Sequence, residues 1–139
     1  MSVTFHRAFD ATRDPFEALD SLIELGVDRV LTSGSHATAL EGRSELAHLV
    51  AHARGRIAIL AGGGINARNV AELVGSTGVQ EIHAGSAVSQ PTLSVLSTPK
   101  PEIIAANFAW ELPYQQTNAG LVAELVQAVR GIETEGNRW

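Results

Sequence analysis

The feature that most constrains this chain is a repeated unit, in which a short apolar run ends in polar or glycine residues and an amphipathic helical pattern follows. Strand-length runs that alternate with helical patterns indicate βα units and a parallel sheet. The unit recurs about four times, and its apolar runs are Val3–His6, Arg29–Thr32, Arg56–Ala61 and Gln80–Ala84.

The spacing of these units predicts the fold class. Units of roughly 25 residues are typical of (β/α)8 barrels, which use about 250 residues in all. We therefore predict an α/β fold of the TIM-barrel type, to which this 139-residue chain contributes about four βα units as a partial barrel. Four units leave two sheet edges open, so we expect a homo-oligomer or another association through those edges.

The helical patterns carry start and stop signals. Asp14, Pro15 and Glu17 combine an N-cap acid, a proline at the first helical position and a glutamate in the first turn, and Gly26 follows as a stop. The later helices are expected to start near Thr38, Asn66 and Thr117, and the last to end at Gly131.

Residues 87–116 interrupt the repeat. They hold four of the five prolines, which disfavour a long regular helix, although a short helix over Glu102–Ala109 would fit between them. We expect one domain over residues 1–139, with 87–116 as an irregular insertion after the fourth strand.

Composition excludes several classes of function. The formal net charge of -5 argues against nucleic acid and anionic membranes as partners, because both reward clustered Lys and Arg, whereas a small-molecule or metal ligand stays compatible. The absence of cysteine excludes disulfides, iron–sulfur clusters, thiolate zinc sites and a cysteine nucleophile. No apolar stretch approaches the ~20 residues of a membrane span and residues 1–4 show no signal-peptide layout, so we expect a cytoplasmic protein.

The first apolar run ends in three residues that can carry chemistry. Strand alternation directs His6 into the barrel, with Arg7 beside it and Asp10 in the following loop. This grouping suits proton transfer, metal binding or an anionic substrate. The structural alternative is a histidine hydrogen-bonded in the core and an Arg–Asp pair that braces the loop, and spacing does not separate the two.

The second run ends in hydroxyl groups and a glycine. Thr32, Ser33 and Gly34 could present hydrogen-bond donors to a ligand. The same residue types are ordinary turn and cap residues, and that interpretation is favoured.

The third and fourth runs end in glycines. Barrels often bind phosphate at the loops that follow their last two strands, and glycine lets the backbone approach a ligand closely. The residues that fit such an anion site are Gly63, Gly64, Gly85 and Ser86. The alternative is that these residues only make tight βα turns.

Alternation on the fourth run points Glu81 and His83 inward. Together with His6 they predict a polar cavity, or else an internal network of ion pairs and hydrogen bonds that fills the barrel. His6, Asp10 and His83 are the candidate catalytic residues, and whether the chain catalyses a reaction stays open.

Five short motifs occur in a fixed order, and together they resemble the CutC family of copper-homeostasis proteins. The resemblance covers roughly Val3 to Ser86. The motifs are His6-Arg7-Ala8-Phe9-Asp10, Leu31-Thr32-Ser33-Gly34, Ala39-Leu40-Glu41-Gly42, Gly62-Gly63-Gly64-Ile65-Asn66 and Glu81-Ile82-His83.

The resemblance implies a cytoplasmic (β/α)8 barrel with a role in copper handling, of which this chain would be the C-terminal half, and it brings no settled enzymatic activity. Family members commonly read Ser-Ala-Arg after the eighth strand, where this chain reads Ser86-Ala87-Val88. The cavity lining that carries over is His6, Arg7, Asp10, Thr32, Ser33, Gly34, Gly63, Gly64 and His83.

Copper is the ligand that the resemblance implies. Copper(I) prefers sulfur ligands, and the chain has no cysteine and one methionine, Met1. A copper(II) site that uses His6 and His83 is the remaining conjecture, so the metal stays unassigned. We carry three hypotheses: a CutC-family protein in copper homeostasis, an enzyme or binding protein for a small anionic or phosphorylated metabolite at the barrel mouth, and a truncated fragment without independent activity.

Overall fold

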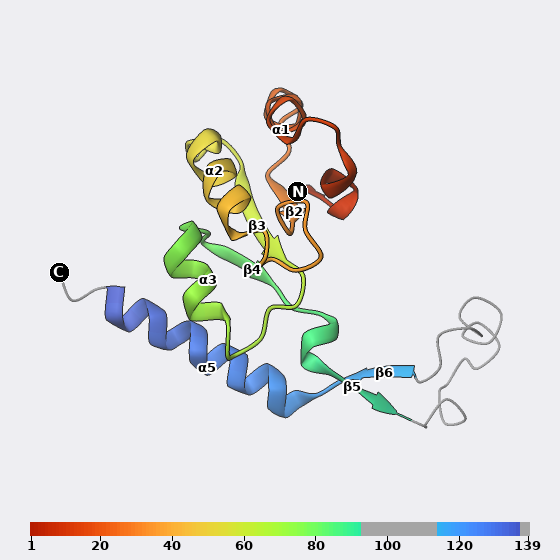
Figure 1. Ribbon diagram of the computed structural model, residues 1–139, viewed down its shortest axis with the longest axis vertical. Helices are drawn as coiled ribbons and strands as arrows, with labels where there is room; N and C mark the ends of the chain where they lie inside the picture. Colours follow the sequence, from red (N-terminus) through yellow and green to blue (C-terminus); the bar gives the residue numbers. More distant parts are fainter. Residues whose placement is uncertain (93–113, 137–139) are drawn as a thin grey trace.

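A computed structural model describes residues 1–92 and 114–136, and within them strands and helices alternate (Figure 1). The strands that follow one another in the main sheet are β1 (Thr4–Phe5), β2 (Arg29–Thr32), β3 (Ala58–Gly62) and β4 (Glu81–His83). The helices are α1 (Pro15–Glu24), α2 (Arg43–Ala53), α3 (Val70–Thr77) and α5 (Ala119–Gly136), with 3-10 turns η1 (Arg7–Ala11) and η2 (Ser86–Val88).

The four main strands form one parallel sheet in the order β1-β2-β3-β4. Val30 of β2 pairs with Phe5 of β1 on one side and with Ile59 of β3 on the other, and Ala61 of β3 pairs with Ile82 of β4. The prediction of βα units and a parallel sheet is therefore confirmed. The strand β2 has the predicted bounds, while the other three are shorter or begin later than their apolar runs.

The capping signal of α1 acts as its sequence predicts. The Asp14 side chain accepts hydrogen bonds from the backbone N–H groups of Phe16 and Glu17, at 2.9 Å and 3.1 Å. Pro15 occupies the first helical position, where its missing N–H would have no partner. The helix closes before Gly26, whose φ of 73° lies in the left-handed region.

Three predicted helix bounds were wrong. The second helix does not start near Thr38, because the side chains of Thr38 and Glu41 hold a turn there by accepting from each other's backbone N–H groups, and α2 begins at Arg43. The third helix does not open at Asn66, because the side chains of Asn66 and Asn69 hold a turn there by bonding backbone N–H groups, and α3 begins at Val70. The last helix does not end at Gly131. It continues to Gly136, because Ile132 still packs against the core beside Val129.

The predicted insertion at 87–116 has regular structure at both described ends. The strands β5 (Ser89–Thr92) and β6 (Tyr114–Thr117) pair antiparallel, with Ser89 opposite Thr117. The backbone N–H of Asn118 donates to the Val88 carbonyl at 2.9 Å and closes the base of this hairpin. The short helix expected over Glu102–Ala109 lies outside the described residues.

The helices cover one face of the sheet. Figure 1 shows α1, α2, α3 and α5 in an arc outside the strands. Val30 and Thr32 point toward these helices and are fully buried. Leu31, which lies between them, and its partner Leu60 on β3 are partly exposed. We call the other side, formed by Arg29, Leu31, Ala58, Leu60 and Glu81, the open face. No described element covers it.

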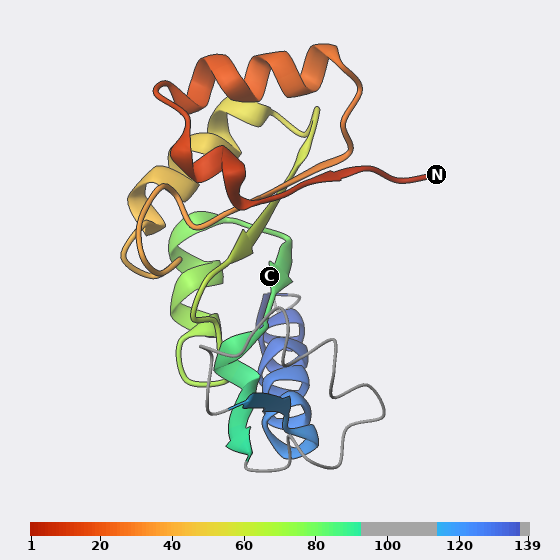
Figure 2. The ribbon, with the colours of Figure 1, turned by 90° about the vertical axis from the view of Figure 1, so that its right-hand side faces the viewer.

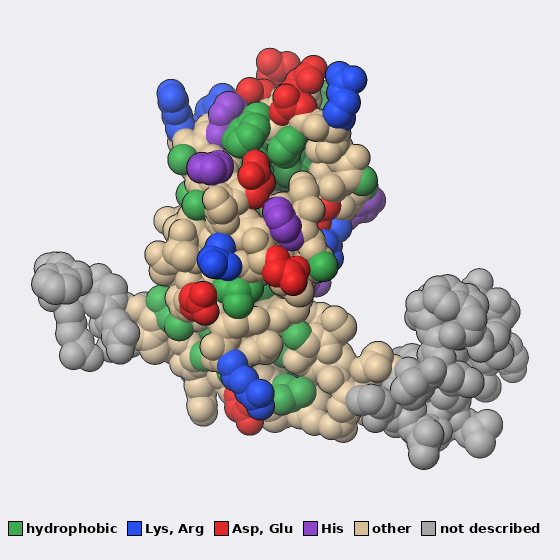
Figure 3. All heavy atoms as spheres, viewed as in Figure 1, with side chains coloured by type: hydrophobic (Ala, Val, Ile, Leu, Met, Phe, Trp, Pro, Cys, Tyr) green, Lys and Arg blue, Asp and Glu red, His purple; other side chains and the backbone are tan. Residues whose placement is uncertain are grey.

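The surface carries both signs of charge. On the face drawn in Figure 3, basic and acidic side chains are interspersed, and acidic side chains gather over α1. Among the helices of the described residues, none is long and apolar enough to span a bilayer.

Candidate functional site

The carboxylate of Asp10 joins the ends of β1 and β2. It lies in η1, just after β1, and accepts a hydrogen bond from the Thr32 hydroxyl at 2.5 Å at the end of β2. It also accepts from the backbone N–H of Ser33 at 3.1 Å and of Ser35 at 3.2 Å, and from Arg7 Nε at 2.7 Å. Both carboxylate oxygens are therefore occupied by donors from two consecutive βα loops.

These contacts hold Asp10 in its ionised form. Burial acts to raise its pKa, but hydrogen bonds from Thr32, Arg7 and the backbone of Ser35 and Ser33 outweigh burial and hold the pKa below its ordinary value. An ionised carboxylate whose lone pairs are filled is a poor proton acceptor. The geometry therefore favours a structural role for Asp10, in which it holds the two loops together, over a catalytic role.

Arg7 extends the cluster toward the third strand. Its Nη2 donates to the Ser33 hydroxyl at 2.6 Å and to the His36 carbonyl at 3.3 Å, while Nε is held by Asp10. Nη1 makes no hydrogen bond within the described residues, and it would lie 3.5 Å from a Cβ placed on Gly63. Arg7 thus keeps one donor nitrogen beside the end of β3, on a side chain that is 43% exposed.

Gly34 permits a close approach of two backbone segments. Its φ is 69°, and a Cβ there would lie 2.5 Å from the carbonyl oxygen of Gly42, at the start of α2. A Cβ on Gly42 would in turn clash with the Ser33 carbonyl. The two glycines therefore serve contact between the β2 end and α2, and the interpretation of Gly34 as a turn residue is favoured.

The glycines after β3 are placed beside the same cluster. Gly63 has a φ of 119°, and its carbonyl accepts from the Ala39 N–H at 2.9 Å. A Cβ on Gly63 would lie 3.3 Å from Ser33 Cβ, and one on Gly64 would lie 3.3 Å from Thr38 Cγ2. The structure thus brings the ends of β1, β2 and β3 together.

His6 caps η1 at the tip of β1. Its Nδ1 accepts from the Ala8 N–H at 3.0 Å, and its ring stacks on Phe5 with centroids 5.4 Å apart. Because Nδ1 is an acceptor, the ring proton of the neutral histidine lies on Nε2. That nitrogen makes no hydrogen bond in the described part of the chain.

The remaining predicted residues lie at the end of β4. His83 is exposed, and its Cβ lies 3.4 Å from the place that a Cβ on Gly62 would take. Gly85 caps η2, and Ser86 opens it. Within residues 1–92 and 114–136, no hydrogen bond or ion pair links His83, Gly85 or Ser86 to the Asp10 cluster.

The valine that replaces the expected arginine is part of the core. Val88 is the last residue of η2, is 5% exposed, and lines one hollow together with Leu121 of α5. That hollow has a volume of about 250 Å³, lies between the loops that follow β3 and β4, and is lined in part by Arg68 and Glu124. Leu121 and Glu124 of α5 form part of its wall, and none of its lining residues belongs to the Asp10 cluster.

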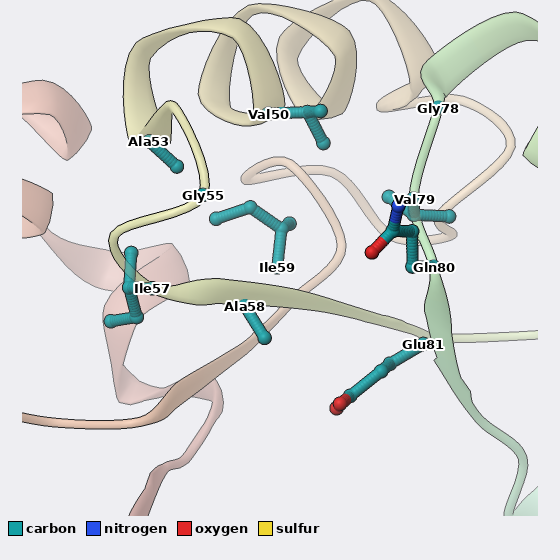
Figure 4. A pocket seen from close by; sticks show the side chains of 10 residues that line it. All are labelled: Val50, Ala53, Gly55, Ile57, Ala58, Ile59, Gly78, Val79, Gln80 and Glu81. Atoms are coloured by element: carbon teal, nitrogen blue, oxygen red, sulfur yellow. The ribbon is translucent and has the colours of Figure 1, made fainter.

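Another hollow lies at the opposite end of the sheet from the predicted mouth. It has a volume of about 230 Å³ and is lined by the amino-terminal ends of β3 and β4 and the end of α2 (Figure 4). Figure 4 shows Val50 and Ile59 on the α2 side of β3, and Ala58 and Glu81 on the other side. The hollow is therefore remote from the Asp10 cluster.

Metal ligands do not gather around these residues. In the described ranges there is no group of three or more His, Cys, Asp or Glu side chains that could hold an ion. The conjectured copper(II) pair of His6 and His83 is joined by no described contact.

Two residues of the cluster escaped the sequence argument. Ser35 has a φ of 61°, which is uncommon without glycine, and it donates its N–H to Asp10. His36 offers its carbonyl to Arg7 and to the Ser33 hydroxyl, and its Nδ1 lies 2.6 Å from the Gly34 carbonyl. Their only signal was position, directly after a predicted strand end.

The comparison with known proteins decides the family. A sequence profile of the CutC family matches residues 1–88, which is more than half of the chain. The chain belongs to the CutC family. The resemblance read from the five motifs is therefore confirmed.

Individual CutC proteins match different stretches of the chain. A family protein CutC of Vibrio vulnificus is 50% identical over 92 residues, which are 66% of this chain and 37% of the relative. One of Vibrio campbellii is 39% identical over 129 residues, which are 93% of this chain and 52% of the relative. The chain thus spans between about a third and about a half of the length of these CutC relatives.

A crystal structure of CutC from Streptococcus agalactiae, whose role in copper homeostasis is described as provisional, has a similar fold. The TM-score is 0.57 at 34% sequence identity, over 60% of this chain and 41% of that one. The α/β fold with a parallel sheet is accordingly that of a CutC protein.

Proposed function

We propose that this protein takes part in copper homeostasis, in the cytoplasm, as a partial (β/α)8 barrel of the CutC family. The observation that carries the proposal is the family match over residues 1–88, which hold all four main strands and the Asp10 cluster. Four consecutive parallel strands with helices along one face are what a segment of such a barrel requires. The provisional copper role of the similar Streptococcus agalactiae protein supports the same function.

The chemistry of the chain favours a role other than a copper–thiolate centre. Copper(I) prefers sulfur, and the chain has no cysteine and a single methionine at position 1. The polar cluster at the ends of β1 and β2 offers oxygen acceptors and a guanidinium instead. We therefore expect copper handling to depend on the integrity of this cluster rather than on a sulfur-bound ion.

Complementation tests this function. The 139-residue chain is expressed in a bacterial strain that lacks its own CutC, and survival and cell copper content are measured during copper exposure. We expect the chain to restore tolerance and Asp10→Asn to lose it, because the amide cannot accept the same set of bonds. Arg13→Gln, at an exposed arginine outside the cluster, is the matched control. Failure to restore tolerance at equal protein level would contradict the proposal.

A second function is favoured by one observation, the unoccupied Nη1 of Arg7 beside Gly63. A guanidinium next to glycine backbone N–H groups suits a small phosphorylated or other anionic metabolite. Asp10 partly neutralises Arg7, so we expect weak binding.

A titration with inorganic phosphate, followed by amide chemical shifts, tests this anion site. Shifts at residues 7, 63 and 64 that saturate and vanish in Arg7→Gln support it. Uniform small shifts, equal in Arg7→Gln and Arg13→Gln, would reduce the effect to nonspecific screening.

A further inference from the structure

The open face is unusual for a parallel sheet. Parallel sheets are normally covered on both faces. Here Leu31 and Leu60 are partly exposed on the open face, although β2 and β3 are the central strands. The edge strands β1 and β4 each pair on one side only within the described residues. A complementary surface is therefore required.

An ion pair on the open face shows which surface fits. Arg29 Nε donates to Glu81 Oε2 at 2.6 Å, and the two side chains come from β2 and β4, with β3 between them. The interior of a closed barrel is built from layers of four side chains taken from alternate strands. Arg29 and Glu81 therefore supply two adjacent side chains of one such layer. The other two side chains of that layer have to come from strands that the described residues do not contain.

A second copy of the chain supplies those two side chains with matching charge. A twofold axis along the strands sets β4 of each copy beside β1 of the other. The even strands then present Arg29, Glu81, Arg29 and Glu81 in turn around the interior. Each arginine lies between two glutamates, and the layer is neutral. A strongly acidic or basic partner would lack this balance.

The two sheet edges are also complementary in shape and polarity. Along β1, Val3 and Phe5 are 51% and 37% exposed, although Phe5 pairs with the buried Val30 and lies on the helix side. Beside β4, on the same side, a hollow of about 270 Å³ is lined by Val79, Ile82 and apolar side chains of α3 and α5. Closure would bring the apolar edge of one copy against the hollow of the other.

We propose that two copies of this chain close into one eight-stranded parallel barrel, with the open faces inward and β1 of each copy beside β4 of the other. The mouth of that barrel would carry two Asp10 clusters around one opening. This inference rests on the partial-barrel proposal but on no ligand, so its test is independent of copper and of phosphate. In the longer CutC relatives, the residues outside the matched stretch could close the sheet in place of a second copy.

Light scattering after size-exclusion chromatography tests the dimer on the full chain. We expect a mass of twice 14.7 kDa that falls toward the monomer on dilution. A folded monomer at every concentration would overturn the proposal, as would a trimer or an open-ended polymer, because neither forms a closed barrel of eight strands.

Charge reversal tests the arrangement. Arg29→Glu or Glu81→Arg alone would place four like charges in one layer, and we expect each to raise the dimer dissociation constant at least tenfold. Arg29→Glu combined with Glu81→Arg restores alternation and should restore the dimer. The pair is partly exposed in a single copy, so single reversals should leave circular dichroism unchanged. A folded double variant that stays monomeric would refute the layer.

Edge substitution gives an independent measurement. Phe5→Asp should dissociate the dimer, whereas Leu25→Asp, at a residue that is 78% exposed outside the edges, should not. A dimer that survives Phe5→Asp and both single reversals would use another surface, and the proposal would be wrong.

Discussion

Asp10 and Thr32 are joined by a 2.5 Å hydrogen bond that fastens the end of β1 to the end of β2. Thr32 is fully buried, and its hydroxyl also accepts from the Gly34 N–H at 2.9 Å. One hydroxyl therefore satisfies a carboxylate and a buried backbone donor at once. This double use is why the cluster depends on a hydroxyl side chain at that position.

Thr32→Val should destabilise the protein by about 1–3 kcal/mol, because it leaves Asp10 short of a donor and the Gly34 N–H without its acceptor. Urea unfolding monitored by circular dichroism measures the change. Ser44→Ala, at an exposed position of α2, should stay within about 0.5 kcal/mol. Equal effects of the two substitutions would contradict the role assigned to Thr32.

The lowered pKa of Asp10 makes part of the stability depend on pH. An aspartate whose pKa is lower in the folded protein stabilises it above the unfolded pKa of about 3.9, and that contribution is lost as pH falls through the folded value. We expect the stability difference between the natural chain and Asp10→Asn to be constant near neutral pH and to shrink below about pH 4. Urea unfolding over this range measures it. A difference that grows as pH falls would reverse the sign and contradict the assignment.

Gly34→Ala should destabilise strongly, by about 2 kcal/mol or more, because a Cβ would meet the Gly42 carbonyl and the residue has a positive φ. Thermal unfolding provides the comparison. Gly75→Ala is the matched control, since Gly75 lies inside α3 with open space around its Cβ position. That change should stabilise by roughly 0.5–1 kcal/mol. Equal loss at both positions would refute the close-approach argument.

Val88→Arg should not recover the family pattern at low cost. The valine is 5% exposed, so the substitution would bury a guanidinium in an apolar cluster and cost about 3 kcal/mol or more. Val126→Arg, at a residue of α5 that is 42% exposed, should be nearly neutral. Denaturant midpoints of the two variants decide. A stable Val88→Arg protein would mean that η2 can turn its side chain outward.

The parts of the fold that sequence predicted are those fixed by local signals. The bounds of β2 follow its apolar run, and Asp14 caps α1 through its own side chain. The last helix ran past Gly131 because tertiary packing of Ile132 outweighs the low helix propensity of one glycine. Packing of this kind has no local sequence signature.

The candidate site was predicted in position but not in role. Its residues were placed correctly at the ends of the first three strands, because parallel strands end on one edge. The sequence left the role of Asp10 open between catalysis and a brace with Arg7, since three of its four donor residues, Thr32, Ser33 and Ser35, lie 22 or more residues away. The spacing also could not reveal that Gly34 allows the backbone of Gly42 to approach closely, rather than making room for a ligand.

The paired base of β5 and β6 has a consequence for how this chain can vary. Ser89 pairs with Thr117, and the backbone N–H of Asn118 donates to the Val88 carbonyl. The segment that follows β4 and the segment that precedes α5 are therefore held side by side. The pairing of β5 with β6 thus brings the two points at which the chain leaves Thr92 and returns at Tyr114 next to each other. Insertions, deletions and peptide tags should therefore be accepted between those two residues, and evolution is free to lengthen or shorten the chain at this point.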